Sequence, residues 1–292
     1  MKEMKMLARK AAKVAFGLSL LVMLAGLASC KDDDKDDDGN KGNAALEAKL
    51  QGKWTITASR AQGNDTWLDW NSGAFTFAFT KTGGYTVTLG NLSQSGTYEV
   101  IGKKKVRITA NSVVQTFEIT NSDQDVLEYA LYEGSKTTPT AYYKASRMPT
   151  TAEEAKRMII GQWRYLGYEL EGKYTSADDE IYEEFTENGE WYRIFYVPKD
   201  IAREDLSKYK GQYVGWIRYS SSYFSMDPND EDPSHGYLTD PKEFPYSARW
   251  FENLTASSVS LGFWGTDRCY KYTRAPKKIK YKIIDYPGGF DL

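Results

Sequence analysis

The feature that most constrains the fold of this 292-residue chain is an ordered series of five short motifs that occurs twice. Each series opens with glycine-x-tryptophan and closes with a tyrosine–lysine pair and an arginine four residues after the tyrosine. In chain order the motifs are Gly52–Trp54, Phe79–Tyr85, Gly96–Tyr98, Phe117–Thr120 and Tyr143–Arg147, then Gly161–Trp163, Phe185–Trp191, Gly211–Tyr213, Phe251–Thr255 and Tyr270–Arg274. A series repeated in the same order indicates a diverged tandem repeat.

Apolar and polar residues alternate in short runs within each copy. Phe75, Phe77 and Phe79 would share one face of a strand, because successive side chains of a strand point to opposite faces. The same period of two continues through residues 85–89, after a turn signal at Lys81–Gly84. We therefore predict half-buried antiparallel strands joined by tight turns, a meander that closes into a barrel or packs as a sandwich.

A short helix is predicted before each glycine-x-tryptophan motif. Residues 44–50 form the first candidate and residues 151–160 the second. The second has the clearer start, because Thr151 and Glu154 form a capping-box pattern after Pro149.

This succession of a short helix, glycine-x-tryptophan, a meander and a closing arginine resembles the lipocalin-like domain, and most closely the small lipocalin-like domains of Bacteroides-type lipoproteins. The resemblance implies an all-β fold of two small antiparallel lipocalin-like β-barrels in tandem, at residues 44–147 and 148–275. Residues 276–292 would be a C-terminal extension whose alternating apolar residues and lysines suit an edge strand. Tandem β-sandwiches, like carbohydrate-binding modules on surface lipoproteins, are the alternative, although they explain neither the helices nor the arginines.

The resemblance also implies two structural pairs, Trp54 with Arg147 and Trp163 with Arg274. In lipocalins the tryptophan plugs the closed end of the barrel and the arginine packs over it. A guanidinium on an indole face is a stabilising contact. An eight-stranded barrel lies at the limit between an interior filled by side chains and one with room for a small ligand.

The N-terminus resembles that of a bacterial lipoprotein. Basic residues precede an apolar run at 15–27, and Leu27–Cys30 resembles a lipobox. The resemblance implies a signal peptide at residues 1–29 and acylation of Cys30, which would anchor the protein to a membrane. An ordinary secretory signal peptide is the alternative.

An acidic segment follows the cysteine. Six aspartates between positions 32 and 38 cannot bury apolar area, so residues 30–43 are expected to form a disordered tether. Its start, Lys31–Asp33, resembles the export signal of surface lipoproteins in the Bacteroides phylum. The expected location is therefore the outer membrane of a Gram-negative bacterium, lipid-anchored at the cell surface, with a periplasmic position as the alternative.

Composition excludes several classes of function. Without residues 1–29 the chain has 33 basic and 39 acidic residues, a formal charge of −6, and it has no basic stripe for nucleic acid. Its single histidine, His235, rules out a multi-histidine metal site. Acylation of Cys30 would leave Cys269 as the only free thiol, so no internal disulfide is expected. No cofactor or metal is predicted.

Tryptophans supply the candidate binding residues, because flat aromatic faces suit sugars, apolar ligands and protein partners. Trp67 and Trp70 lie in a connection that would cover the open end of a barrel. The second copy contributes Trp191, Trp216, Trp250 and Trp264. We predict a lipid-anchored cell-envelope protein that binds a small apolar or glycan ligand, or an outer-membrane partner. The alternative is a structural or assembly subunit with filled barrels and core tryptophans.

An enzymatic role is not expected. Glu183 and Glu184, or the acidic run Asp178–Glu180, offer carboxylates for the hydrolysis of a glycoside. Such chemistry requires two carboxyl groups at a set separation across one cleft, and the sequence does not define that separation.

Overall fold

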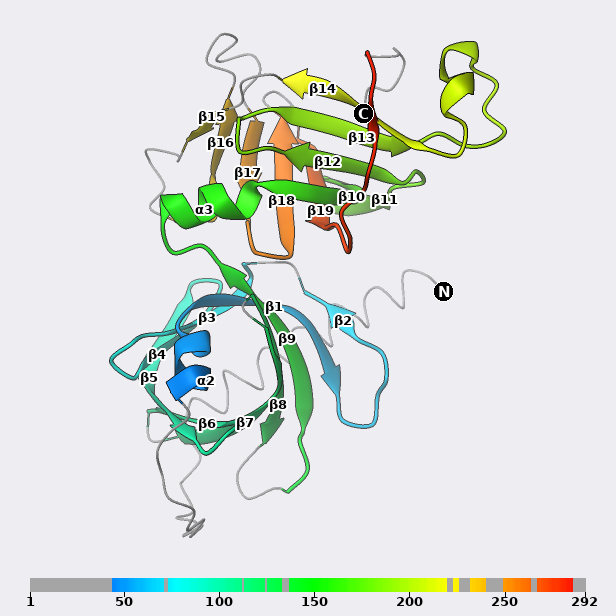
Figure 1. The fold of residues 1–292 in the computed structure, drawn as a ribbon. Coiled ribbons are helices and arrows are strands. Elements are labelled where there is room, and N and C mark those ends of the chain that lie inside the picture. Colours follow the sequence, from blue (N-terminus) through cyan, green and yellow to red (C-terminus); the bar gives the residue numbers. More distant parts are fainter. Residues whose placement is uncertain are drawn as a thin grey trace. The chain divides into compact units, whose positions relative to one another are not determined.

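The computed structural model describes residues 44–70, 73–111, 113–123, 125–132, 137–219, 223–225, 232–239, 249–263 and 267–285. These residues fall into two compact units that divide between Met148 and Pro149 (Figure 1). Each unit has a sheet and a core of its own. The predicted signal peptide at residues 1–29, the lipidation site Cys30, the tether at residues 30–43 and Trp264 lie outside the described residues.

The first unit is a closed antiparallel β-barrel. Its elements are α2 (Ala44–Leu50), β1 (Gly52–Ala61), β2 (Leu68–Asp69), β3 (Phe75–Phe79), β4 (Gly84–Leu89), β5 (Leu92–Ile101), β6 (Lys105–Ala110), β7 (Val113–Ser122), β8 (Val126–Tyr132) and β9 (Ala141–Met148). Strands β1 and β3 to β9 follow one another around the ring, and β9 pairs with β1 to close it. A single closed sheet is incompatible with a two-sheet sandwich in this unit.

The barrel interior is built by the predicted alternation. Phe75, Phe77 and Phe79 are buried, while the residues between them are only partly covered. Ring contacts continue from Phe77 to Tyr129 and from there to Tyr143, at centroid distances of 6.1 and 5.2 Å. Aromatic rings therefore fill much of the interior of the first unit.

Helix α2 covers one end of this barrel (Figure 1). Its apolar side chains Leu46 and Leu50 are buried and belong to the barrel core. The indole nitrogen of Trp54 donates a hydrogen bond of 2.8 Å to the carbonyl oxygen of Leu50. The chain enters β1 at this end, so the opposite end of the barrel contains the connections before β3, β5, β7 and β9.

The second unit contains one helix, a 3-10 turn and eleven strands in its described residues. They are α3 (Ala152–Ile159), β10 (Gly161–Leu170), β11 (Lys173–Ser176), β12 (Ile181–Phe185), β13 (Trp191–Tyr196), η2 (Glu204–Tyr209), β14 (Tyr213–Tyr219), β15 (Tyr223–Ser225), β16 (Gly236–Thr239), β17 (Arg249–Glu252), β18 (Ser258–Phe263), β19 (Cys269–Arg274) and β20 (Lys282–Ile283). Helix α3 starts as predicted, since the side chain of Thr151 accepts from the backbone N–H of Glu154.

The predicted second closed barrel is not shown. The sheet runs in the order β15-β16-β17-β18-β19-β10-β12-β13-β14-β20, and no pairing joins β14 to β15 in the described residues. In the first unit the ten-residue strand β5 reaches past β4 to pair with β6. In the second unit the corresponding β14 has seven residues, and β15 has three residues that pair with β16. Among the residues that the structure describes, strands this short leave the sheet open at this point.

Three of the five repeated motifs adopt the same local geometry in both units. Each motif tryptophan lies opposite its closing arginine, and a β-bulge follows after two more residues of the first strand. In both F-T-x-x-G turns the threonine carbonyl accepts from the glycine N–H, and its hydroxyl accepts from the N–H of the next residue. The sequence match thus marks the strand that opens each sheet, the first tight turn and the last strand.

The two other motifs do not fall at equivalent positions. Tyr85 pairs with Gly96 in the first unit, whereas the corresponding Trp191 pairs with Tyr219, eight residues after Gly211. The prediction that Gly96–Tyr98 and Gly211–Tyr213 correspond is therefore wrong, because strand register rather than motif order decides which residues are equivalent.

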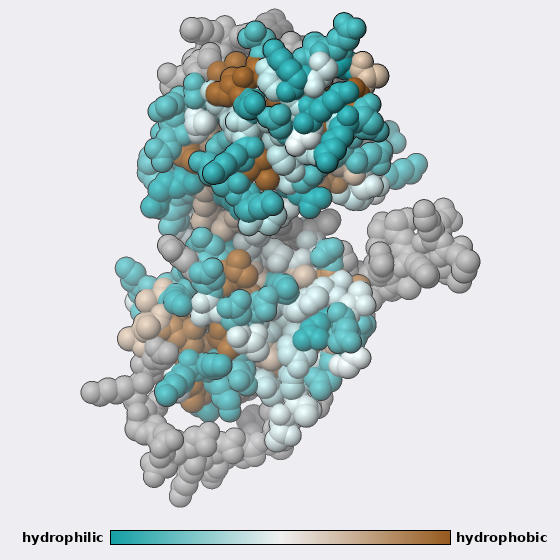
Figure 2. All heavy atoms as spheres, turned by 45° about the vertical axis from the view of Figure 1, so that its right-hand side comes forward, coloured by the Kyte–Doolittle hydropathy of each residue, from teal (hydrophilic) through white to brown (hydrophobic). Residues whose placement is uncertain are grey.

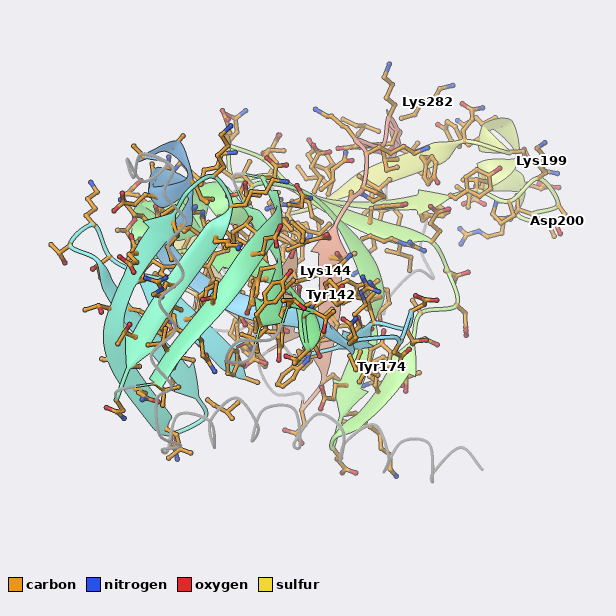
Figure 3. The ribbon with its side chains drawn as sticks, turned by 90° about the horizontal axis from the view of Figure 1, so that it is seen from below. Tyr142, Lys144, Tyr174, Lys199, Asp200 and Lys282 are labelled. Carbon is orange, nitrogen blue, oxygen red and sulfur yellow. The ribbon has the colours of Figure 1, made fainter. Side chains whose placement is uncertain are left out.

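The last described residues, 275–285, form a C-terminal strap across the outer face of the second sheet. Ile279 in this strap is 3% exposed, and the amide of Gln162 binds both its backbone N–H and its carbonyl, at 2.6 and 3.0 Å. The strap ends in β20, which pairs in parallel with β14, and Lys282 points away from the sheet (Figure 3).

Candidate functional sites

The tryptophan–arginine pairs lie beside the helix that precedes the first strand of each unit. The guanidinium carbon of Arg147 lies 4.4 Å from the ring centroid of Trp54, and that of Arg274 lies 3.7 Å from Trp163. Arg147 also donates to the carbonyl oxygens of Lys49 and Gln51, and Arg274 donates to those of Met158 and Ile160 at the end of α3. Each arginine thus satisfies carbonyls at the end of a helix, where a cation is favoured. These contacts join the last strand of each unit to its first strand and to the helix before it.

Trp70 lies at the opposite, loop-bearing end of the first barrel. Its indole nitrogen donates to the hydroxyl of Ser59 at 2.8 Å, and its ring centroid is 6.1 Å from that of Phe75. Ser59 is 1% exposed and pairs with the buried Tyr143, so its side chain faces the interior. Half-buried Trp70 therefore packs against the barrel core and covers this end.

Trp67 has a different environment from Trp70. The Nζ atom of Lys144 lies 4.5 Å from its ring centroid, and the guanidinium carbon of Arg60 lies 5.2 Å away. Arg60 also lies over Tyr142, at 4.2 Å, and Tyr142 and Lys144 both come from β9 (Figure 3). Trp67 is thus held on the outside of the sheet by two cations.

Two glutamines were not singled out by the sequence, yet they bring polar groups into the first barrel. Gln94 and Gln115 are each the third residue of their strand, β5 and β7, near the loop-bearing end. They pair with the buried Val87 and Ile108, so both side chains face inward. Both amide nitrogens are buried, and neither has a hydrogen-bond partner among the described residues. A glutamine at an inward position of an alternating strand is the signal that identifies them.

Phenol groups add further polarity to this interior. Desolvation by burial raises the pKa of Tyr85. The pKa of Tyr129 is raised by the same desolvation and then by the neighbouring Tyr143 and Tyr85. These hydroxyls stay protonated at neutral pH and are available as donors and acceptors.

The second unit contains a buried charged cluster on its inner face. Glu183 and Arg193 are 0% and 2% exposed, and an Nη2 atom of Arg193 lies 2.5 Å from Oε1 of Glu183. The same carboxylate oxygen accepts from the hydroxyl of Tyr272 at 3.1 Å and lies 4.0 Å from an Nη1 atom of Arg218. Burial disfavours the charged form of Arg193, but Glu183 and Tyr272 hold its pKa above the ordinary value.

The candidate carboxylates Glu183 and Glu184 point to opposite faces of β12. Glu183 belongs to the buried cluster, whereas Glu184 accepts from the amide of Gln162 at 2.9 Å on the strap side. Asp178 and Asp179 are exposed, and both lie in the turn before β12. Neighbouring strand residues cannot supply two carboxyl groups to one cleft. The described residues also hold no cluster of acidic, histidine and cysteine side chains suited to a metal ion.

The described tryptophans of the second unit are buried or half-buried. Trp191 and Trp216 are 1% and 4% exposed. Trp250 is half-buried and its ring lies directly against Gly262, its partner on the neighbouring strand. The thiol of Cys269 is also partly buried, and desolvation raises its pKa, which lowers its reactivity as a nucleophile. Among the described helices, none has the length and apolar character that crossing a membrane requires.

The structures compared with this chain share little sequence with it. No family model and no curated protein matches the chain. One similar structure is an uncharacterized protein from Bacteroides eggerthii, with 13% identity and a TM-score of 0.27, covering 34% of this chain and 98% of that protein. Another is a protein of unknown function from the DUF3598 family of Nostoc punctiforme, with 9% identity and a TM-score of 0.23, covering 81% of this chain and 100% of that protein.

Proposed function

We propose that this chain is a lipid-anchored protein of the bacterial outer membrane, displayed at the cell surface, that binds a small ligand at the loop-bearing end of its first barrel. The lipobox-like Leu27–Cys30 and the acidic segment after it support the anchor and the tether. Several acyl chains on Cys30 would hold the protein stably, where one chain gives only marginal binding.

The observation that carries the binding function is the pair of inward amides, Gln94 and Gln115, in a largely aromatic interior. A buried donor without a partner destabilises a fold by about 1–3 kcal/mol. A ligand that brings hydroxyl or carbonyl groups would satisfy both amides, and Trp70 offers it an aromatic face nearby. This chemistry favours a glycan or another hydroxylated ligand over a plain hydrocarbon.

The test is a calorimetric titration of the mature chain, without residues 1–29 and carrying C30S, against a panel of mono- and oligosaccharides and a panel of medium-chain alcohols. The expected result is a ligand whose affinity falls about tenfold or more in Q94L and in Q115L, because each variant loses one hydrogen bond of roughly 1.4 kcal/mol. W67A is the matched control, since Trp67 lies outside the sheet. The proposal would be overturned if no compound in the two panels bound to the chain.

We also propose that the second unit is a diverged copy of the same lipocalin-like barrel. Its tryptophan–arginine pair, bulge and first turn repeat those of the first unit residue for residue. The open region between β14 and β15 is then where the second copy has changed most.

A structural or assembly role is the second candidate, and the packed rings of the first interior favour it. A partner would then bind the outer surface. Figure 2 shows small hydrophobic patches separated by hydrophilic residues on the face it draws. Exposed apolar side chains occur at Leu92, Val114, Leu166, Tyr174, Ile217 and Ile283. Cross-linking on intact cells followed by mass spectrometry tests this role, which predicts recovery of one specific outer-membrane protein.

A further inference from the structure

We infer that the C-terminal strap of the second unit, residues 275–285, is a docking surface for an anionic lipid bilayer, with its lysines on phosphate head groups and Ile283 in the interface. The strap belongs to the second unit and is separate from the ligand site proposed in the first barrel. Its biological setting rests on the proposed function, because a chain anchored through Cys30 stays within reach of a membrane surface.

The strap concentrates positive charge in an otherwise acidic chain. Four of its residues between positions 277 and 282 are lysines, and together with Asp285 they give the strap a formal charge of +3. Residues 30–292 as a whole carry −6, so the rest of that stretch carries −9. All four lysines are exposed, and none of them forms an ion pair within the described part of the chain: Lys277, Lys278, Lys280 and Lys282. Their charges are therefore open to an external anion.

The strap holds these lysines in fixed positions. Ile279 is buried, and the amide of Gln162 binds both its backbone N–H and its carbonyl, at 2.6 and 3.0 Å. The ring of Tyr281 lies against Gly215. The side chains that attach the strap thus alternate with exposed lysines, and Lys282 points away from the sheet (Figure 3). Lysines on an ordered backbone lose less conformational entropy on docking than lysines of a disordered tail.

An exposed apolar side chain accompanies the lysines. Ile283, directly after Lys282, is 67% exposed and is paired with Gly215 of β14. Ile217 lies two residues further along β14, on the same face as Gly215, and is 41% exposed. Basic residues beside exposed apolar ones are typical of surfaces that bind the membrane interface, where lysines attract anionic head groups and apolar side chains enter the acyl boundary. A soluble polyanion would use the lysines but not Ile283, so the arrangement favours a bilayer.

A second lysine run, at residues 103–105 around the turn between β5 and β6, has different surroundings. Lys105 lies opposite Glu118, and Arg107 of the same strand binds Glu99 at 2.8 Å. Carboxylates therefore offset part of the positive charge there. Because this run is also exposed, it provides a matched control in the same chain.

Electrostatic screening confines the attraction to the strap. At physiological ionic strength the Debye length is about 8 Å, so acidic residues farther from the bilayer contribute little repulsion. Each lysine close to an anionic surface strengthens binding about fivefold. Four lysines give weak binding on their own, which a tether to the same membrane would turn into a lasting contact.

The experiment is co-sedimentation of the same mature C30S chain with vesicles of phosphatidylcholine alone and of equimolar phosphatidylcholine and phosphatidylglycerol. The chain should bind the anionic vesicles only, and added salt should release it. K278Q/K280Q should weaken binding about 25-fold, whereas K104Q/K105Q, which removes the same charge from the first unit, should leave it unchanged. I283A should weaken binding about fivefold, because the variant loses apolar area that the interface buries. All the substituted side chains are exposed, so the variants are expected to fold.

Soluble polyphosphate distinguishes a bilayer surface from a general polyanion site. Binding to polyphosphate without binding to anionic vesicles would overturn the inference, as would absence of binding to any vesicle. Equal binding to neutral and anionic vesicles, equal losses in the two double-lysine variants, or full binding by I283A would overturn it as well. Because the C30S chain has no acyl anchor, none of these outcomes bears on the acylation of Cys30 or on the sugar titration of the first barrel.

Discussion

At the scale of single residues, the glycine of each glycine-x-tryptophan motif is fixed by two independent constraints. Gly52 has a φ angle of +122°, which L side chains rarely adopt, and a Cβ atom there would lie 2.5 Å from Nη1 of Arg147. Gly161 repeats both features, with φ at +116° and a Cβ position 3.0 Å from Arg274. The glycine is therefore what allows the arginine to reach the helix carbonyls beside it.

We predict that G52A destabilises the first unit by about 2–4 kcal/mol, because backbone strain and the displacement of Arg147 add together. G102A is the matched control. Gly102 also has a positive φ of +61°, but no atom lies within 4 Å of its Cβ position, so its cost is about 1 kcal/mol. Urea unfolding of both variants measures the difference, and equal midpoints would show that the contact with Arg147 has no energetic effect.

For the two inward amides we predict that substitution increases stability, in contrast to the loss predicted for G52A. Q94L and Q115L should each raise the melting temperature of the ligand-free chain by roughly 2–4 °C, since each removes a buried donor that has no partner. Q162L should lower it, because the Gln162 amide makes three hydrogen bonds to Glu184 and Ile279. Differential scanning calorimetry compares the three variants. A lower melting temperature in Q94L would mean that the amide serves the fold.

Some residues of the candidate sites can be predicted from the sequence, whereas their orientation and their contacts cannot. The loop position of Trp67 and Trp70 was visible from the residues, but only the strand register shows that one faces the core and the other the outside. Glu183 and Arg193 are ten residues apart in sequence and come together because β12 and β13 form a hairpin. Tertiary pairing of this kind is not contained in the composition of either strand.

At the scale of the elements, the strap illustrates how a short segment is held. Its two-residue strand β20 contributes little pairing, so the anchoring comes from Ile279, which packs with Tyr182, Tyr192 and Ile194 on the outer face of the sheet. The aromatic ring of Tyr281 lies close against Gly215, where a Cβ atom would be 2.6 Å from it. Apolar burial and a small residue beneath the ring therefore position the strap.

We predict that I279A destabilises the second unit by about 2–4 kcal/mol, the usual effect of truncating a buried isoleucine. I283A, four residues on in the same strap, should change stability by less than about 0.5 kcal/mol, because Ile283 is 67% exposed. Urea unfolding followed by tryptophan fluorescence measures both. Similar midpoints for the two variants would contradict the anchoring role of Ile279.

The elements themselves were predictable where their pattern is local. Alternation identified β3 and β4, and the capping threonine identified the start of α3. The short strands β2 and β20 have no period to recognise, and each exists because a longer strand beside it offers free backbone groups. Closure of the first sheet and the opening of the second depend on pairing between distant strands, which local propensity does not determine.

At the scale of the whole molecule, the two units share the tryptophan–arginine pair, the β-bulge and the first tight turn, and they differ in the chemistry of their interiors. The first is closed and largely aromatic, and its polar groups include amides, phenols and the hydroxyl of Ser59. The second is open in its described part and carries a buried ionic cluster. The polar groups inside the two units therefore differ in kind, with amides and hydroxyls in the first and a buried ion pair in the second.

Buried tyrosines in both units make the stability of the whole chain depend on pH in the alkaline range. Burial raises the pKa of Tyr165 to about 12, and it also raises the pKa values of Tyr85 and Tyr129 well above the ordinary value near 10. In the unfolded chain these phenols ionise near pH 10. The folded state therefore binds more protons than the unfolded state above that pH. The stability that these groups contribute is complete below about pH 9 and is lost as the pH rises through 10 toward 12.

We expect the urea midpoint to be level from pH 7 to 9 and to fall steadily above pH 10, with tyrosinate absorbance at the buried phenols appearing only as the chain unfolds. Y165F should make this decline less steep, because phenylalanine keeps the ring packing and removes one ionising group. A midpoint that stays constant to pH 11.5, or full ionisation of the tyrosines near pH 10 in a chain that remains folded, would show that the phenol groups reach solvent. In that case the interiors would be far more hydrated than their packing implies. A hydroxylated ligand would then have to displace bound water, instead of filling hydrogen-bonding positions that are empty.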